Sequence, residues 1–166
     1  NDYLGLANHP AVKSAYLDAV ENWVAGSGSS RLICGSLKPH RQLEIYLAEA
    51  KGTEAALMFA NGYAASVGTL SGILRKGDTV IVDKLSHASL IDGARLSGAT
   101  IRVFPHNDLV KLEKLLDSTT AKASPDTRVL IVTESVFSMD GDIALLREII
   151  ELKKKYGALL LVDEAH

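Results

Sequence analysis

The chain has a single cysteine, Cys34, among its 166 residues. One cysteine excludes an internal disulfide and any metal site built from several cysteines, so we expect no metal, and it is typical of a reducing compartment. The sequence also has no apolar run as long as a membrane span and no charged-then-apolar signal in its first residues. We therefore expect a cytoplasmic protein.

An excess of charge of one sign is also missing. The formal net charge is −2, from 18 basic and 20 acidic residues. A chain without a large basic field is not expected to bind nucleic acid or a membrane surface. Its 47% hydrophobic and 23% charged residues are typical of a globular domain with a real core.

Short apolar runs alternate with helical segments along most of the chain. The predicted strands cover residues 55–59, 79–83, 100–104, 128–133 and 158–162, and the predicted helices between them cover 62–74, 88–96, 109–116 and 143–156. Runs of Val, Ile and Leu are typical of strands that are covered on both faces. The pattern predicts a three-layer α/β/α fold with a mostly parallel sheet.

The first 50 residues differ from this pattern. A helix is predicted over residues 10–23, and a glycine- and serine-rich loop follows at 26–30. A second helix, with Leu43 and Leu47 on one face, ends near Gly52. We expect residues 1–50 to lead into an α/β domain over 51–166. Because the last predicted strand is followed at once by polar residues, we expect the chain to be a piece of a longer protein.

Polar side chains follow the predicted strands, where open α/β sheets bind their ligands. They are Asn61, Ser86, His87, His106, Asn107, Asp108, Glu134, Ser135, Ser138, Asp140, Asp142, Asp163 and His166. A helix after Gly62 could present free N–H groups to a phosphate. Each feature also has a purely structural interpretation: Asn61-Gly62 as a turn, His87 as a helix entry, Asp142 as the cap of the next helix, and Asp163 as a cap or surface acid.

Two nucleotide-binding motifs are missing from the sequence. The stretch after the first predicted strand, Asn61-Gly62-Tyr63-Ala64-Ala65, lacks the spaced glycines of dinucleotide sites, and no phosphate loop ending in Gly-Lys-Ser/Thr occurs. The remaining combination of phosphate cradle, imidazole and strand-end carboxylate favours a phosphate-bearing heteroaromatic cofactor.

Five motifs, in the same order, resemble those of the α-oxoamine synthases, enzymes of fold type I that depend on pyridoxal 5'-phosphate (PLP). They are Asn-Asp-Tyr-Leu-Gly-Leu (1–6), Ser-His-Ala-Ser-Leu (86–90), His-Asn-Asp (106–108), Val-Phe-Ser-Met-Asp-Gly-Asp (136–142) and Val-Asp-Glu-Ala-His (162–166). The resemblance therefore extends over the whole chain. It implies the major, cofactor-binding domain of this fold, present only in part.

The resemblance also implies roles for individual residues. Asp163 corresponds to the carboxylate that pairs with the pyridine nitrogen of PLP, His87 to the imidazole on the cofactor ring, and His166 to the residue near its phenolic oxygen. The other implied cofactor residues are Asn61, Gly62 and Tyr63 in a phosphate cup, and Glu134 and Ser138 along the pocket. Asn1 and Ser138 are implied on the substrate side, with Asn1 helping to hold the amino-acid carboxylate.

The family reaction joins an amino acid to an acyl-CoA or acyl carrier protein thioester, usually with loss of carbon dioxide. The resemblance therefore implies a PLP-dependent acyltransferase that works as a homodimer. None of the lysines present stands in the context of the family's cofactor-binding lysine, which is expected further along the chain. We expect these 166 residues alone to be inactive.

Different stretches favour different family members. Ser-His-Ala-Ser-Leu (86–90) and Phe-Pro-His-Asn-Asp (104–108) are most similar to members that condense L-alanine with a pimeloyl thioester in biotin biosynthesis. Arg-Leu-Ile-Cys-Gly (31–35) is more similar to members that use glycine and acetyl-CoA. Leu32 argues against succinyl-using members, and Phe137 and Asp140 argue against palmitoyl-using ones. Two other classes stay open: a non-catalytic regulatory subunit of the same fold, and an aminotransferase.

Overall fold

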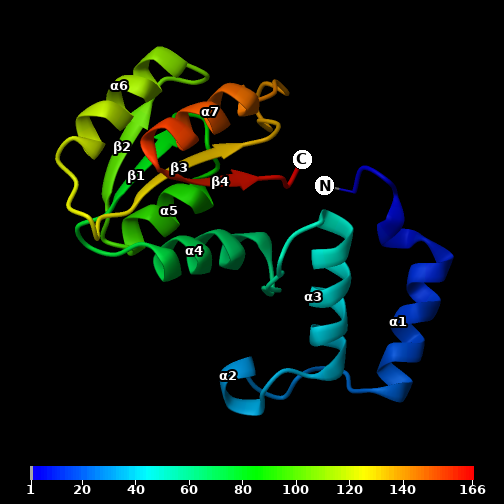
Figure 1. Ribbon diagram of the computed structural model, residues 1–166. Helices are drawn as coiled ribbons and strands as arrows, with labels where there is room; N and C mark the ends of the chain where they lie inside the picture. Colours follow the sequence, from blue (N-terminus) through cyan, green and yellow to red (C-terminus); the bar gives the residue numbers. More distant parts are fainter. Residues whose placement is uncertain (1) are drawn as a thin grey trace. The chain divides into compact units, whose positions relative to one another are not determined.

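The computed structural model describes residues 2–166 and divides between Met58 and Phe59 into two compact units (Figure 1). Asn1, predicted on the substrate side, lies outside the described residues.

The first unit is helical. It contains a 3-10 turn, Leu6–Asn8, and the helices α1 (Pro10–Asn22), α2 (Arg31–Cys34) and α3 (Lys38–Lys51). Proline in the first turn suits both long helices. The α3 helix ends at Gly52, whose φ of 63° is the left-handed conformation that glycine adopts without strain. The two helices predicted in this region are confirmed.

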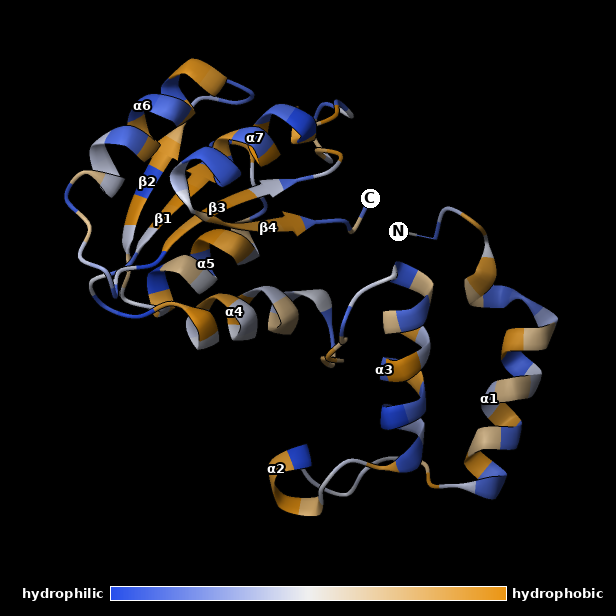
Figure 2. Cartoon of the chain, viewed as in Figure 1, coloured by the Kyte–Doolittle hydropathy of each residue, from blue (hydrophilic) through white to orange (hydrophobic). Residues whose placement is uncertain are grey.

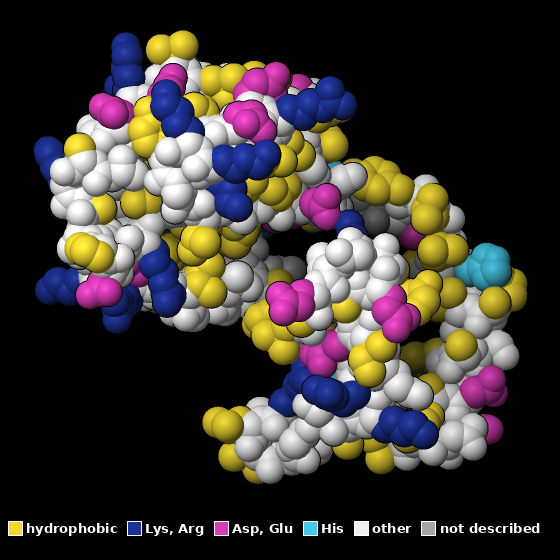
Figure 3. All heavy atoms as spheres, viewed as in Figure 1, with side chains coloured by type: hydrophobic (Ala, Val, Ile, Leu, Met, Phe, Trp, Pro, Cys, Tyr) yellow, Lys and Arg dark blue, Asp and Glu magenta, His cyan; other side chains and the backbone are white. Residues whose placement is uncertain are grey.

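Few side chains of the first unit are buried. Glu44 is the buried residue of its helices, and large apolar side chains of α1 and α3 stay exposed. Apolar atoms are visible over this part of the surface in Figure 3. Those exposed on α1 and α3 are Val12, Tyr16, Leu17, Val20, Leu43, Ile45, Tyr46 and Leu47. Such an exposed apolar set is typical of a surface that is covered in the working protein.

A charged pair holds the first unit together. Arg31 donates two hydrogen bonds to the carboxylate of Glu44, at 2.5 and 3.1 Å. The backbone N–H of Met58 donates a third, at 3.0 Å. The hydrogen bonds from Arg31 and then from Met58 lower the pKa of Glu44 to about 2. The α2 helix is thereby attached to α3 and to the end of the unit.

The second unit is the expected α/β structure. Its elements are α4 (Gly62–Ile73), β1 (Thr79–Asp83), α5 (Ala88–Leu96), β2 (Thr100–Phe104), α6 (Leu109–Thr120), β3 (Val129–Glu134), α7 (Leu146–Tyr156) and β4 (Leu159–Asp163). The four strands are parallel and lie in the order β2-β1-β3-β4. Helices α4 and α5 cover one face, and α6 and α7 cover the other (Figure 1). The predicted α/β class and parallel sheet are confirmed.

Alternating strand residues build one core on each face, because successive side chains of a strand point to opposite sides. The core under α4 and α5 contains Leu70, Leu74, Val80, Val82, Leu90, Ala94, Leu130 and Val132. The core under α6 and α7 contains Ile81, Phe104, Leu112, Leu115, Leu116, Val129, Ile131, Ile149 and Ala158. The strand residues of both sets come from strands that are largely apolar, as the hydropathy colours show (Figure 2).

The strand order sets the place of a ligand site. The chain passes from β1 to β2 on one side and then returns to β3 on the other side of β1. The helices that follow β1 and β3 therefore cover opposite faces of the sheet. This arrangement opens a crevice at the carboxyl ends of the two strands.

One predicted element is wrong, and another begins later than predicted. Residues 55–59 form no strand, because no neighbouring strand pairs with them among the described residues and a strand is stabilised by its partner. The helix predicted from residue 143 begins at Leu146 instead, because Ile143 forms an antiparallel bridge with Val136. Asp142 does not cap this helix, whose N-cap is Leu145. The carboxylate of Asp142 binds His106 and Asn107 instead.

None of the helices within residues 2–166 is both long and apolar enough to cross a membrane.

Candidate functional site

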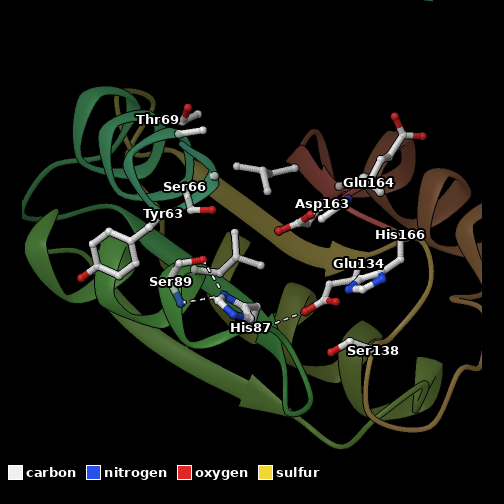
Figure 4. A pocket seen from close by; sticks show the side chains of 16 residues that line it. Tyr63, Ser66, Thr69, His87, Ser89, Glu134, Ser138, Asp163, Glu164 and His166 are labelled. Carbon is white, nitrogen blue, oxygen red and sulfur yellow. Dashed lines mark hydrogen bonds between the residues drawn. The ribbon is translucent and has the colours of Figure 1, made fainter. Parts of the chain in front are cut away.

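A cavity of about 480 Å³ opens at the carboxyl ends of the strands in the second unit. Its size is typical of a site for a small molecule. Seven residues predicted for the site lie along it (Figure 4): Gly62, Tyr63, His87, Glu134, Ser138, Asp163 and His166. Asn61 immediately precedes the lining helix and caps it.

The first turn of α4 has donors to offer to an anion. The side chain of Asn61 accepts the N–H of Ala64 at 2.8 Å. The N–H groups of Gly62 and Tyr63 have no acceptor among the described residues, and both residues line the cavity. Asn61-Gly62 is therefore a helix start rather than an isolated turn. Unpaired N–H groups at a helix N-terminus favour a phosphate or carboxylate.

His87 is both a helix cap and a cavity residue. Its Nδ1 accepts the N–H of Ser89 at 3.2 Å and lies 2.8 Å from the hydroxyl of Ser89. These contacts fix the ring at the start of α5, where it lines the cavity. The helix-entry interpretation of His87 and the ligand interpretation are therefore compatible.

Glu134 is the buried carboxyl group of the site, with 4% of its surface exposed. It ends β3 and accepts the backbone N–H of His87 at 2.5 Å, so it joins the ends of β1 and β3 (Figure 4). Burial raises the pKa of Glu134, the hydrogen bond from His87 opposes this rise, and the charge of Asp163 adds to it. A carboxyl group with a raised pKa in a cavity is typical of a functional site.

Asp163 ends β4 directly opposite Glu134 in the sheet register. It is half-buried, and one of its oxygens accepts the N–H of Ala165 at 2.9 Å. His166 lies on the same side of the cavity (Figure 4). Asp163 is therefore not the cap of a following helix among the described residues. It is a strand-end carboxylate directed at the cavity (Figure 4).

Four polar residues of the cavity were not identified from the sequence: Ser66, Thr69, Ser89 and Glu164. Ser66 and Thr69 lie four and seven residues after Gly62, which is one face of a helix. That spacing could have identified Ser66 and Thr69 as cavity residues from the sequence. Ser89 lies on the first turn of α5, beside His87.

The donors and acceptors of the cavity suit PLP. Helix N–H groups match a phosphate, a carboxylate matches a protonated ring nitrogen, and an imidazole matches a flat aromatic ring. No lysine is among the described residues that line the cavity. No group of three or more His, Cys, Asp or Glu residues within 2–166 could hold a metal ion.

Comparison with known proteins assigns the family. The model of aminotransferase class I and II matches residues 1–166. The chain belongs to this family. Among curated members of the family, it is 51% identical to the 8-amino-7-oxononanoate synthase of Geobacter sulfurreducens and 50% identical to that of Geotalea daltonii. Each match covers 100% of this chain but only 41% and 42% of the relative, so the chain spans about two fifths of the length of these enzymes.

Solved structures of the family agree with the fold. The serine palmitoyltransferase of Sphingomonas wittichii superposes with a TM-score of 0.91 at 40% identity, over 99% of this chain and 40% of that one. An 8-amino-7-oxononanoate synthase from Francisella tularensis superposes with a TM-score of 0.79 at 29% identity, over 99% of this chain and 43% of that one. The predicted resemblance to α-oxoamine synthases and the predicted fold type are confirmed.

Proposed function

We propose that the complete protein is a PLP-dependent acyltransferase that condenses L-alanine with a pimeloyl thioester, the reaction of an 8-amino-7-oxononanoate synthase. One observation carries the proposal: a single cavity brings together a helix N-terminus, His87 and Asp163. The names of the curated relatives, 8-amino-7-oxononanoate synthases, support the choice of this reaction within the family. We propose residues 51–166 as part of the PLP-binding domain, with 1–50 leading into it.

Bound PLP supplies an electron sink for negative charge that develops at the α-carbon of the amino acid. In the proposal, the carboxylate of Asp163 keeps the ring nitrogen protonated, because a nearby negative charge favours the protonated form. A protonated ring withdraws electrons more strongly than a neutral one. Asp163 is thus the residue that sets the strength of the electron sink.

The remaining residues bind and orient. The N–H groups of Gly62 and Tyr63, in the helix turn that Asn61 caps, are proposed to receive the phosphate. His87 is proposed to lie against the cofactor ring, and His166 to approach its phenolic oxygen. Ser138 is proposed to contact cofactor and substrate, and Asn1 is proposed to help hold the carboxylate of the amino acid.

Glu134 is proposed to orient His87 rather than to exchange protons with the substrate. Its hydrogen bond from the backbone of His87 supports this role.

Other assignments within the family rest on narrower observations. The stretch 31–35, Arg-Leu-Ile-Cys-Gly, favours the second candidate, a 2-amino-3-ketobutyrate CoA ligase that uses glycine and acetyl-CoA. A 5-aminolevulinate synthase or a serine palmitoyltransferase ranks below it, as does a non-catalytic subunit of the same fold.

A substrate matrix tests the proposal. The complete protein is assayed with L-alanine and glycine, each combined with pimeloyl-CoA and acetyl-CoA, and released CoA is measured. Alanine with pimeloyl-CoA is expected to give the highest kcat/KM. A preference for glycine with acetyl-CoA would transfer the assignment to the second candidate. PLP binding without turnover of any pair would support the non-catalytic subunit.

We also propose that the complete protein is a homodimer in the cytoplasm. The exposed apolar side chains of α1 and α3 support the dimer, because an apolar surface of this kind is usually covered. The single free cysteine supports a reducing compartment. Sedimentation of active protein as a monomer would contradict the dimer.

A further inference from the structure

A second polar cluster lies at the same edge of the sheet as the cavity but does not line it. We name Asp83, His106, Asn107 and Asp142 the imidazole clamp. Asp83 ends β1, His106 and Asn107 follow β2, and Asp142 lies between β3 and α7. The clamp therefore joins three connections of the sheet, although none of its members is part of the cavity wall.

The ring of His106 bridges two carboxylates. Its Nδ1 lies 3.0 Å from Asp83, and its Nε2 lies 2.5 Å from Asp142. An ionised carboxylate only accepts hydrogen bonds, and a neutral imidazole has one N–H group. Both contacts are satisfied together when both ring nitrogens carry a proton. The geometry is that of an imidazolium between two aspartates.

The charge state agrees with this geometry. Burial opposes a charge on His106, but the hydrogen bonds to Asp142 and then to Asp83 outweigh it, so the pKa of His106 is raised. The charged groups that face the ring are Asp83 from β1 and Asp142 from the connection after β3. The other neighbours, Phe137 and Asn107, are uncharged. The side-chain nitrogen of Asn107 lies 3.3 Å from Nε2 and donates to Asp142 instead when Nε2 carries a proton.

Backbone groups and an unusual backbone conformation also take part in the clamp. Asp83 has 1% of its surface exposed and accepts the N–H groups of Leu85 at 2.9 Å and Asn107 at 3.1 Å. Asn107 has a φ of 54°, in the left-handed region that asparagine tolerates better than most residues. Its side chain donates to Asp142 at 3.2 Å. Asn107 thus contacts both carboxylates that His106 bridges.

The clamp holds the turn that carries Ser138. The N–H of Phe137 donates to the carbonyl of Asp142 at 2.9 Å, which closes the turn around Ser138. His106 contacts both ends of this turn: Asp142 through Nε2, and the ring of Phe137 edge-on at 4.4 Å between centroids. On its other side, His106 is fixed to Asp83, four residues before His87.

We propose that His106, as an imidazolium, is a positioning residue that holds Ser138 at the cavity and couples ligand binding there to the protonation of His106. The inference rests on the proposed PLP site. Because the pKa of His106 is raised in the folded protein, the clamp is complete below the ordinary histidine pKa of about 6.5 and is lost as pH rises through the higher folded value.

A double-mutant cycle tests the inference. Apo forms of the complete protein are titrated with PLP, and the Kd is measured from absorbance for wild type, His106→Gln, Ser138→Ala and the double variant. His106→Gln is expected to weaken PLP binding about 10-fold at pH 6, an effect typical of residues that orient a binding group. The ratio of the Kd of His106→Gln to the Kd of wild type should shrink as pH rises. In the Ser138→Ala background, His106→Gln should have no further effect.

Several results would overturn the inference. An equal effect of His106→Gln in both backgrounds would mean that His106 supports the fold generally. An unchanged Kd in His106→Gln, with PLP binding intact in wild type, would reject the inference alone. Absence of PLP binding in wild type would reject the proposed function and the inference together. His9→Gln, a change at an exposed histidine of the first unit, is the matched control and should leave the Kd unchanged.

Should His106→Gln fail to fold, nuclear magnetic resonance of wild type tests whether the His106 ring is an imidazolium. The ¹⁵N shifts of the His106 ring are expected to report two protonated nitrogens at pH 6, below the ordinary histidine pKa of about 6.5. A neutral ring at that pH would overturn the inference.

Discussion

Glu134 and Asp163 lie opposite each other at the ends of neighbouring strands, yet their surroundings differ. Glu134 is almost fully buried and has a raised pKa, whereas Asp163 is half-buried at the edge of the cavity. Two carboxyl groups that differ in environment take different roles. We propose that Asp163 pairs with the ring nitrogen of the cofactor and that Glu134 orients His87.

Replacing Asp163 with asparagine tests this assignment. The amide keeps the shape of the side chain but removes the charge that holds the ring nitrogen protonated. Turnover of the complete protein is expected to fall about 100-fold or more, the size of loss seen when an electrostatic partner of a reacting group is removed. PLP absorbance serves as the control, because the variant should still bind the cofactor. Unchanged turnover would reject the role of Asp163.

Glu44 gives a pH prediction for the first unit. Its folded pKa of about 2 lies below the unfolded value of about 4.5, so its ion pair with Arg31 stabilises the fold above about pH 4.5. This contribution is lost as pH falls from about 4.5 through about 2. In urea unfolding of the complete protein, Glu44→Gln should be less stable than wild type at pH 6, and the difference should shrink across this window. A difference that is independent of pH would contradict the ion pair.

The residues of the site could be predicted from the sequence because they follow from one rule. His87, Glu134 and Asp163 come after or at the end of three strands, and the carboxyl ends of parallel strands meet at one edge. The contacts of His106 with Asp83 and Asp142 could not be predicted. They join residues 23 and 36 positions apart, and only the three-dimensional course of the connections brings them together.

At the scale of elements, α4 and α5 determine the shape of the cavity. Gly93 of α5 faces α4 so closely that an added Cβ would lie 2.9 Å from the carbonyl oxygen of Ser66 and 2.9 Å from Leu70 Cδ1. Ser66 lines the cavity and His87 begins α5. The glycine therefore lets the helix with the phosphate donors pack against the helix with the imidazole.

Gly93→Ala is expected to destabilise the complete protein by about 1–3 kcal/mol, because the backbone of Ser66 cannot move aside without shifting α4. Urea unfolding measures the loss. Gly72→Ala on α4 is the matched control, since an added Cβ there meets nothing within 4 Å. That change should be neutral or stabilise by up to about 1 kcal/mol. Equal behaviour of the two variants would show that the helix contact tolerates a side chain.

The elements predicted from apolar periodicity were right where a partner exists within the chain. Residues 79–83 and 100–104 pair as β1 and β2 with the predicted bounds. The equally apolar residues 55–59 have no pairing strand among the described residues and stay irregular. Composition predicts that a segment can be a strand, whereas pairing decides whether it is one.

At the scale of the whole molecule, the cavity has groups that suit the phosphate, the ring and the ring nitrogen of PLP, but its described lining lacks a lysine. The described lining residues include none, and Lys153, Lys154 and Lys155 lie on α7, away from it. The chain spans about two fifths of its relatives. Covalent attachment of the cofactor by these enzymes needs a lysine amine. We therefore expect the attaching lysine of the complete protein to lie outside residues 1–166.

Borohydride reduction of the complete protein with bound PLP tests this expectation. Reduction converts a cofactor–lysine linkage to a stable amine, and peptide mass spectrometry then locates it. The modified lysine is expected on a peptide that does not belong to residues 1–166, and the 166-residue chain alone should show no turnover. Modification at Lys84, the lysine next to the end of β1, would instead assign the covalent chemistry to this chain, and would require the connection before His87 to move toward the cavity.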